Sequence, residues 1–462
     1  MSQRRELTII GGGLVGLAAA IELARQGYQP RVLERGPNPL EHIRARGRSV
    51  HLVLSARGKR CLHQLGILES VLALGLPLVG RQFHGHDGAV QLSNYARDGA
   101  AIHCIERGAL HKELVDCALA AGRGIDIQWN SQVEHVDPDT GAVSGQDGSG
   151  AAFHLQSERI LITDGAFSRL RSQLAAADKS LTLSHDWLDL GYKEVGISKA
   201  AALSLGLQAD RFQVWTQNSC FFGAFPNRDG SFTGSLFLSR TGFPSFDSLV
   251  SEADFLHFTR THFPSLSPVA EQLWPQVRYN PVSGLCRVKC NPWTWSGRVL
   301  MLGDAAHAVV PFLGQGMNSG LEDVQLFSQV LADSNHRWPE AIQTFDRTRR
   351  PDADAVDQLS LDNYAHINHR PDPLDPLREQ ISDRLYQLAP WWFQPVYEAV
   401  AFNTQPYSAV LRLERLREQV VEGLLGHPLF KAGWPDDTAQ ADAEILAVIN
   451  HPEFRAGVIR AH

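Results

Sequence analysis

The sequence is poor in cysteine and shows no metal-binding cluster. Six cysteines are spread over 462 residues, and only Cys286 and Cys290 lie close together, without further metal-ligand residues beside them. Disulfide frameworks and zinc sites need a regular arrangement of such ligands. We therefore expect reduced thiols, no bound metal and a cytoplasmic location.

Long apolar runs and an excess of basic charge are also lacking. The apolar run in the opening MSQRRELTIIGGG is short and leads directly into a glycine turn, unlike a signal peptide. No run of about 18 apolar residues follows, and the sequence ends in HPEFRAGVIRAH, which is not a hydrophobic anchor. The net charge is −7 and no basic stripe stands out. We therefore expect neither a membrane nor a nucleic-acid partner.

The composition that is present is that of a globular protein with two or three domains. Hydrophobic residues make up 44% and charged residues 20% of the chain.

The N-terminal segment of the sequence predicts a parallel, doubly wound sheet. Residues 6–10 form a β-rich run, a helical stretch ends at Gly27, and PRVLERG follows as a second strand.

The middle of the sequence predicts a different architecture. Three β-rich runs, FQVWTQ, CFFGAFPN and SFTGSLFLS, follow one another, and Asp229-Gly230 predicts a hairpin between the last two. The segment RVLMLGD (298–304) then predicts a buried strand, with a helix from about Gln315. Helix formers dominate from about Pro339, interrupted at residues 369–376. We therefore expect an antiparallel sheet and a C-terminal helical region beside the parallel sheet.

A glycine motif between the first strand and helix predicts a dinucleotide site. Gly11, Gly13 and Gly16 form G-x-G-x-x-G. The first two glycines let backbone approach a pyrophosphate, and the third lets the helix pack against the strand. The N-terminus of the helix favours the anion. Glu34 ends the second strand, where a carboxylate can accept hydrogen bonds from ribose hydroxyls.

Two further motifs indicate which dinucleotide binds. Asp164-Gly165 ends an apolar strand in ITDGAFSRLR, and Gly303-Asp304 follows another in RVLMLGDAAHA. With the glycine motif, these segments resemble the three fingerprints of the single-component, group A FAD-dependent aromatic hydroxylases. Thr163 stands where that family usually has alanine. The resemblance implies a Rossmann-like α/β FAD-binding domain, an antiparallel-sheet substrate domain and a C-terminal helical region, the aromatic hydroxylase fold.

The resemblance also implies domain limits. The FAD-binding domain is expected to be discontinuous, over residues 1–75, 97–180 and 290–340. The substrate-binding β-sheet domain is expected over residues 76–96 and 181–289. The C-terminal helical region is expected over residues 341–462.

The same resemblance assigns residues to FAD. Arg107, in ERGALHKEL, matches the family's Arg-x-x-Leu-x-x-x-Leu pattern, whose arginine points at the cofactor. Arg46 and Arg48 belong either to the FAD site or to an exposed basic loop. The FAD-binding residues implied are Gly11, Gly13, Leu14, Gly16, Glu34, Arg35, Arg107, Asp164, Asp304, Pro311, Gly314, Gly316, Met317 and Asn318.

Several longer segments narrow the resemblance. ARGRSVHLVLSARG, GYKEVGI, PNRDGSFTGSLFL, VPFLGQGMN and DNYAHI together resemble the kynurenine 3-monooxygenase family. That family hydroxylates L-kynurenine to 3-hydroxykynurenine with NADPH and O2, through a flavin hydroperoxide. The resemblance thus implies FAD as cofactor, NADPH as co-substrate, and a small anionic aromatic substrate. We expect a monomer or a homodimer.

Four residues match the family's contacts to the amino-acid end of the substrate. Arg81, in VGRQFHGHD, and Tyr95, in SNYARDG, stand where the carboxylate is held. The planar fork of arginine suits a carboxylate because it offers two parallel donors. Asn363, in DNY, and Tyr397, in FQPVY, match the C-terminal polar contacts. Without the resemblance, each would be equally consistent with a surface or helix-face residue.

The stretch VVPFLGQGMN is expected to wrap the flavin ring. By the resemblance, Phe312 and Leu313 face the substrate ring, and Gln315 faces the oxygen site. Leu313 stands where kynurenine-type relatives carry histidine. This departure leaves open a hydroxylase of the same fold that acts on a substituted kynurenine or another anionic aromatic acid. A flavin-free relative that acts only as a binding protein is a second alternative, from another functional class.

Overall fold

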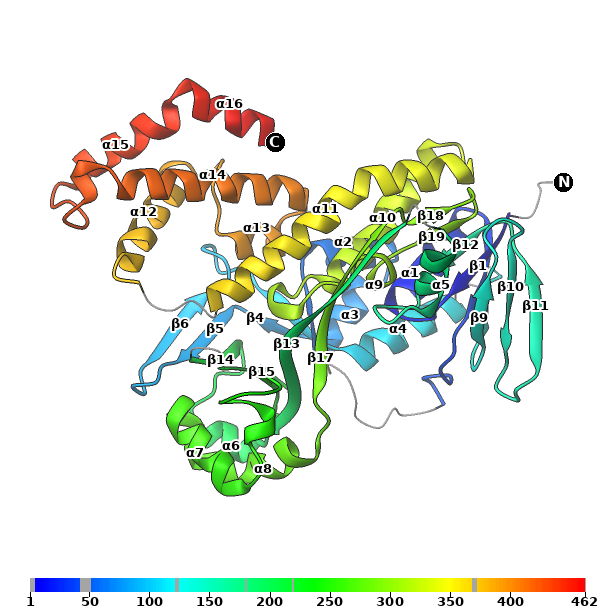
Figure 1. Ribbon diagram of the computed structural model, residues 1–462, viewed down its shortest axis with the longest axis horizontal. Helices are drawn as coiled ribbons and strands as arrows, with labels where there is room; N and C mark the ends of the chain where they lie inside the picture. The colour runs from blue at the N-terminus through cyan, green and yellow to red at the C-terminus, as the bar shows by residue number, and fades with distance from the viewer. Residues whose placement is uncertain are drawn as a thin grey trace.

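The computed structural model describes residues 5–41, 51–120, 124–178, 181–217, 220–367 and 372–461. Arg46 and Arg48 lie outside these described residues. Two large sheets and a group of C-terminal helices make up the molecule (Figure 1). Among the described residues, no helix combines the length and apolar character needed to cross a bilayer.

The first sheet has six strands and is parallel except at one edge. In spatial order its strands are β18 (Thr294–Trp295), β19 (Val299–Met301), β12 (Ile160–Ile162), β1 (Arg5–Ile10), β2 (Tyr28–Leu33) and β8 (Asp126–Gln128). The helices α1 (Leu14–Arg25), α4 (Arg107–Ala120) and α10 (Gly316–Asp333) pack together in the same core. The predicted parallel β-turn-α-β opening is therefore confirmed. Its central strands are buried on both faces, as their continuous apolar runs require.

The second sheet has seven strands drawn from two distant parts of the chain. In spatial order they are β17 (Ser283–Asn291), β13 (Thr182–Ile197), β16 (Phe232–Leu238), β15 (Cys220–Pro226), β14 (Arg211–Gln217), β5 (Gly80–His84) and β6 (Val90–Asn94). The predicted hairpin joins β15 and β16, with Gly230 at φ +84° in its turn. Only the pairing of β14 with β5 is parallel within the described sheet.

The two faces of this second sheet have different partners. One face packs on α6 (Lys199–Ser204), α7 (Glu252–His262) and α8 (Ala270–Tyr279), which close a core of their own. The other face carries aromatic side chains that contact Phe312 and Tyr364 from outside the sheet. The second face is therefore the one that meets the remainder of the molecule.

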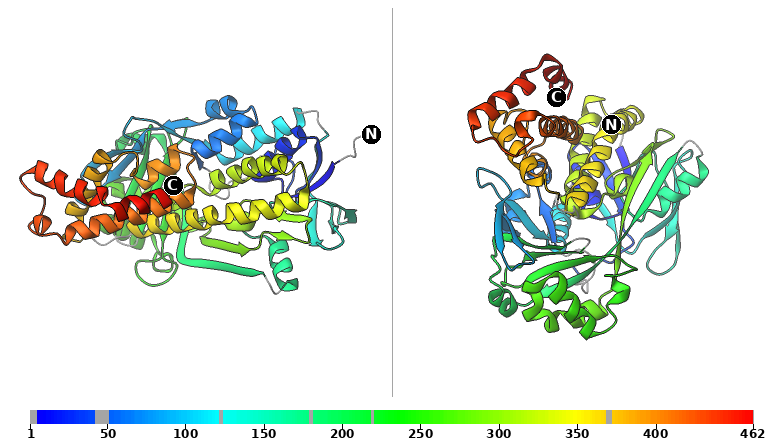
Figure 2. Two further views of the ribbon diagram at one scale, coloured as in Figure 1. Left: turned by 90° about the horizontal axis from the view of Figure 1, so that it is seen from above. Right: turned by 60° about the vertical axis from the view of Figure 1, so that its left-hand side comes forward.

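The C-terminal region is helical, as predicted. It consists of α11 (Trp338–Ile367), α12 (Asp375–Leu388), α13 (Val396–Phe402), α14 (Tyr407–Leu425), α15 (Thr438–Asn450) and α16 (Pro452–Ala461). The long helix α11 starts beside the parallel sheet and ends near the second sheet, while α12 to α16 extend to one side (Figures 1 and 2). Helix α11 packs on both α10 and α14. It therefore links the three parts of the molecule.

Smaller sheets complete the structure. Strands β9 (Gln132–Val136), β10 (Ala142–Gln146) and β11 (Ala152–Gln156) form an antiparallel sheet at the end of the molecule nearest the N-terminus (Figure 1). Strand β7 (Ile102–Glu106) pairs with β3 (His51–Leu54) and β4 (Leu76–Leu78). Helices α2 (Ala56–Gln64) and α3 (Leu68–Leu74) follow β3, and α2 packs on α10.

Candidate active site

The glycine motif forms a tight turn between β1 and α1. Gly11 has φ +106°, and a Cβ at this position would lie 2.6 Å from the Thr163 carbonyl oxygen. A Cβ on Gly16 would lie 2.0 Å from the Gly11 carbonyl oxygen. The hydroxyl of Thr163 donates to that same oxygen at 2.8 Å. Close packing of the strand, the helix and the end of β12 thus requires both glycines, and Thr163 adds a hydrogen bond that alanine lacks.

The N-terminus of α1 is open to a ligand. A Cβ on Gly13 would meet no heavy atom of the described residues within 4 Å. The first turn of α1 has neither an acidic residue nor a side-chain cap. Its free amides therefore remain available to an anion. Nearby, the Glu34 carboxylate accepts hydrogen bonds from the Gly12 and Gly36 amides, both at 2.7 Å, which hold it at the mouth of the turn.

We predict that Gly16→Ala removes cofactor binding or folding altogether. The added methyl group would overlap backbone, which cannot shift without separating α1 from β1. Cofactor content after purification and the thermal midpoint would measure the effect. Gly423→Ala is a matched control, because Gly423 lies in α14, away from the glycine turn, and a Cβ there meets no described heavy atom within 4 Å. A Gly16→Ala protein with wild-type cofactor content would contradict this account of the turn.

Two aspartates lie at the ends of neighbouring parallel strands, β12 and β19. Burial raises the pKa of Asp164 to about 6, and its Oδ1 atom has no hydrogen-bond partner among the described residues. Burial also raises the pKa of Asp304, and the charge of Arg107 opposes this shift. Yet the side chain of Asp304 is solvent-exposed. Asp304 is thus accessible to a ligand although enough protein surrounds it to raise its pKa.

The loop of residues 311–318 lies beside Asp304. A Cβ on Gly316 would lie 3.9 Å from Asp304 Oδ1. Gly314 adopts the left-handed conformation, with φ +67°. The Asn318 amide donates to the carbonyls of Val53 at 2.7 Å and Gly314 at 3.0 Å, and its oxygen accepts from the Ser55 amide at 2.9 Å. Asn318 is therefore a brace that ties the loop to β3, and its side chain is fully buried.

Two residues of this loop that were expected at the reaction site are buried. Leu313 is only 1% exposed and packs into an apolar cluster with Val356 and Val400 from the C-terminal helices. Gln315 is 0% exposed. The Gln315 side chain contacts Tyr407 of α14, and its Nε2 atom is buried without a hydrogen-bond partner among the described residues. The roles expected of Leu313 at the substrate ring and of Gln315 at the oxygen site stay predictions.

The burial of Leu313 changes the expected effect of Leu313→His. We predict a loss of about 1–3 kcal/mol in the free energy of unfolding, because a polar ring would enter an apolar cluster without a partner. Chemical denaturation would measure it. Leu203→His, at a residue 72% exposed, is the control. A stable Leu313→His protein that differs only in substrate KM would favour the original expectation.

Three of the four predicted substrate residues come together. Arg81 lies on β5, Tyr95 follows β6, and Tyr397 lies on α13. The Arg81 guanidinium carbon lies 5.1 Å from the Tyr95 ring centroid and 4.4 Å from that of Tyr397, and the two rings stack at 4.8 Å. Burial raises the pKa of both tyrosines, so they remain neutral hydrogen-bond donors. The cluster offers a cation and two hydroxyls to one anion.

The fourth residue, Asn363, acts on the loop itself. Its Nδ2 donates to the Phe312 carbonyl at 2.8 Å. The next residue, Tyr364, stacks on the Phe312 ring at 4.5 Å, and Phe237 of β16 contacts the same ring at 5.5 Å. Helix α11 therefore holds Phe312 by both its backbone and its side chain. Tyr364 was not among the predicted residues, although it directly follows Asn363 in the DNYAHI segment.

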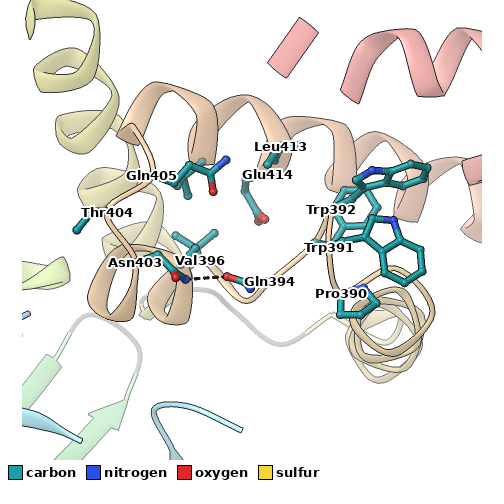
Figure 3. A pocket seen from close by; sticks show the side chains of 13 residues that line it. Pro390, Trp391, Trp392, Gln394, Val396, Asn403, Thr404, Gln405, Leu413 and Glu414 are labelled. Carbon is teal, nitrogen blue, oxygen red and sulfur yellow. Dashed lines mark hydrogen bonds between the residues drawn. The ribbon is translucent and has the colours of Figure 1, made fainter. Parts of the chain in front are cut away.

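A separate pocket lies within the C-terminal helices. It has a volume of about 300 Å³ and is bordered by Trp391, Trp392 and Gln405, among others (Figure 3). Gln394 accepts a hydrogen bond from Asn403 across its floor at 2.9 Å. None of the residues predicted for the active site lines this pocket within the described part of the chain. The 311–318 loop stays the predicted position of the active site.

Comparison with known sequences assigns the family. A sequence model for the family described as "FAD binding domain" matches residues 4–221 and 288–360, which is more than half of the chain. This chain belongs to the FAD-binding family. The family match spans the glycine turn, both aspartate motifs and the 311–318 loop, which are the parts brought together above.

Curated relatives of this FAD-binding protein match nearly the whole chain. The kynurenine 3-monooxygenase of Christiangramia forsetii is 30% identical and covers 97% of this chain and 100% of the relative. That of Salinispora tropica is 34% identical over 92% of this chain and 95% of the relative. That of Xanthomonas oryzae pv. oryzae is 35% identical over 97% and 96%. The resemblance to this family is therefore confirmed.

Solved structures share the fold. A tetrameric 2-methyl-3-hydroxypyridine-5-carboxylic acid oxygenase has a TM-score of 0.65 and 24% identity, and covers 79% of this chain and 92% of its own. The tetracycline destructase Tet(51) has a TM-score of 0.60 and 18% identity, over 88% of this chain and 100% of its own. The predicted aromatic hydroxylase fold is confirmed.

The residues of this FAD-binding protein fit the cofactor. The open N-terminus of α1 and the Glu34 carboxylate suit the diphosphate and a ribose. Hydroxyl groups of the cofactor that lie deeper in the molecule can donate to the unpartnered oxygen of Asp164 and to the accessible carboxylate of Asp304. Arg107 and Arg35 are exposed, and their charges lower the pKa of Asp304 and Asp164 respectively, so both guanidinium groups lie near the path of the cofactor.

Proposed function

We propose that this protein hydroxylates L-kynurenine to 3-hydroxykynurenine, with FAD, NADPH and O2. The observation that carries the proposal is the cluster of Arg81, Tyr95 and Tyr397 at the second sheet, in a chain whose curated relatives are kynurenine 3-monooxygenases. An aromatic amino acid needs one site for its carboxylate and an apolar site for its ring. The cluster supplies the first.

The apolar wall supplies the second. Phe312 forms part of a cluster with Phe237, Phe221 and Leu190 of the second sheet. We expect these apolar side chains to keep water out of the space between the sheet and the 311–318 loop. Exclusion matters because a wet site would let the activated oxygen decay to hydrogen peroxide. When bound, FAD supplies the redox chemistry that activates O2.

The protein's own contribution is orientation. Arg81 binds the carboxylate at one end with a charge-assisted contact, while α11 fixes Phe312 through Asn363 and Tyr364. These contacts would direct the substrate ring toward the loop, and the reaction requires the ring carbon to come within about 3–3.5 Å of the reacting oxygen. The aromatic amine of the substrate activates the ring carbon, so the site requires no acid–base pair.

The alternative, a hydroxylase acting on a substituted kynurenine or another anionic aromatic acid, rests on the departure at Leu313, a residue that is 1% exposed. The decisive experiment is turnover with L-kynurenine and identification of the product by mass spectrometry. Parallel assays of NADPH and NADH oxidation with substituted kynurenines and anthranilate-like acids provide the comparison. If one of these acids stimulates coupled turnover and L-kynurenine does not, the kynurenine assignment is wrong and the broader aromatic hydroxylase assignment stands.

A further inference from the structure

The C-terminal region reaches the 311–318 loop through one buried hydrogen bond. The Tyr407 hydroxyl donates to Gln315 Oε1 at 2.9 Å. Ser55 Oγ lies 3.4 Å from the same oxygen and is the weaker contact. Tyr407 and Gln315 are both 0% exposed, so water cannot replace the tyrosine hydroxyl. Loss of that hydroxyl would leave a buried acceptor poorly satisfied.

Gln315 occupies the position where the loop most needs an anchor. It lies between Gly314 and Gly316, the two residues with the greatest backbone freedom, and directly precedes α10. Its carbonyl accepts the first hydrogen bond of that helix, from the Ser319 amide at 2.8 Å. A side chain fixed here limits rotation of the peptide groups on either side. The orientation of the amides at the start of α10 therefore depends on where the Gln315 side chain is held.

Tyr407 is itself rigidly placed. The Arg57 guanidinium carbon lies 3.7 Å from the centroid of its ring, close enough for a cation–π contact. Arg57 bonds in turn to the Glu322 carboxylate and to the Gln405 carbonyl. Arg57 and Glu322 are buried. The tyrosine hydroxyl is thus fixed relative to both α10 and the start of α14.

We propose that Tyr407 is a positioning residue for the flavin. Through Gln315 it sets the backbone of the 311–318 loop, and so the direction of the amides that face the flavin ring. The C-terminal helical region is then a structural part of the FAD site. This inference rests on FAD binding at the loop and is independent of which aromatic substrate is used.

The test is Tyr407→Phe, which removes one oxygen atom. Titration of the apoprotein with FAD, followed by flavin fluorescence, should show binding weakened about threefold to tenfold, the effect of one neutral hydrogen bond. The visible spectrum of bound FAD should also change, because the ring's surroundings have moved. Tyr386→Phe is the matched control. It removes the same atom from another tyrosine of the C-terminal region, in a cluster that excludes the loop, and should leave both readouts unchanged.

A double-mutant cycle separates positioning from a general loss of stability. Gln315→Leu removes the hydrogen-bond acceptor. The double variant Tyr407→Phe/Gln315→Leu should bind FAD no more weakly than whichever single variant binds FAD more weakly, because both substitutions remove the same contact. Additive effects, or FAD affinity and spectrum unchanged in Tyr407→Phe, would overturn the proposal. If Tyr407→Phe fails to fold, Gln315→Leu with wild-type FAD affinity would overturn it as well. No substrate enters these measurements, so their outcome is distinct from that of the kynurenine assay.

Discussion

Replacing Arg349 with methionine is expected to lower the free energy of unfolding by about 3–5 kcal/mol. Arg349 is 2% exposed, and its guanidinium forms ion pairs with Asp323 at 2.9 Å and with Glu322 at 2.8 Å. Although burial alone would lower it, these carboxylates hold the pKa of Arg349 above its ordinary value. Removal of the Arg349 cation would leave the buried carboxylates of Glu322 and Asp323 without one of their compensating positive charges.

The measurement is urea denaturation, with Arg337→Met as control. Arg337 forms an ion pair of similar length with Glu340, 2.8 Å, but both side chains are more than half exposed. A surface pair contributes about 0–1 kcal/mol, so the control should be nearly neutral. A loss below about 1 kcal/mol for Arg349→Met would show that the network can rearrange or admit water.

Arg349 belongs to a network of buried charged residues between α10 and α11 that also includes Glu322 and Asp323. Asp323 Oδ2 accepts a hydrogen bond from the Gly303 amide at 2.9 Å and lies 2.6 Å from His307 Nε2. Burial alone would raise the pKa of Asp323, but its contacts with His307 and Arg349 hold that pKa below the ordinary value. The Gly303 amide belongs to the turn that presents Asp304. The ion network therefore supports the cofactor cavity as well as the contact between α10 and α11.

Arg81→Ala is expected to raise the KM for L-kynurenine by about 10- to 150-fold, the equivalent of losing a charge-assisted contact of about 1.5–3 kcal/mol. kcat should change less, because the carboxylate lies away from the reacting carbon. Steady-state oxidation of NADPH, with product quantified in parallel, would measure both constants. The KM of Arg81→Lys should lie between those of the wild-type protein and Arg81→Ala, since lysine keeps the charge but lacks the planar fork of arginine.

A decarboxylated kynurenine provides the decisive control for this prediction. With the wild-type protein, the KM of the decarboxylated compound should exceed that of L-kynurenine. The factor should be similar to the one by which Arg81→Ala raises the KM of L-kynurenine. With Arg81→Ala, the two compounds should differ little. If Arg81→Ala raises the KM of both compounds equally, the arginine acts on the shape of the site and the carboxylate assignment fails.

Local chemistry accounts for what the sequence predicted well. The β-turn-α-β opening, the hairpin at Asp229-Gly230 and the helical C-terminus depend on residue types a few positions apart, and all three are present. The need for Gly16 follows from the contact between β1 and α1, which are adjacent in sequence, whereas Gly11 is required by the close approach of Thr163 at the end of β12. Thr163, read as a departure from the family, is explained only by its hydrogen bond to the Gly11 carbonyl.

The side-chain directions within the 311–318 loop could not be predicted in the same way. Leu313 and Gln315 lie two positions apart, as strand residues on one face would, and the resemblance placed both at the reaction site. The loop instead turns at Gly314, with φ +67°, and both side chains point into protein. Leu313 packs against Val356 and Val400, and Gln315 contacts Tyr407. No local sequence pattern shows that these C-terminal residues lie beside the loop.

The sequence by itself determined the class of protein and its cofactor, because the glycine turn and the two aspartate motifs are short-range patterns that carry the family resemblance. Only the tertiary structure decided which distant side chains come together. Tyr397 meets Arg81 and Tyr95 from more than 300 positions away, and Tyr407 meets Gln315 from 92 positions away. Such contacts form when distant elements bury a common surface, and this depends on the packing of the complete fold.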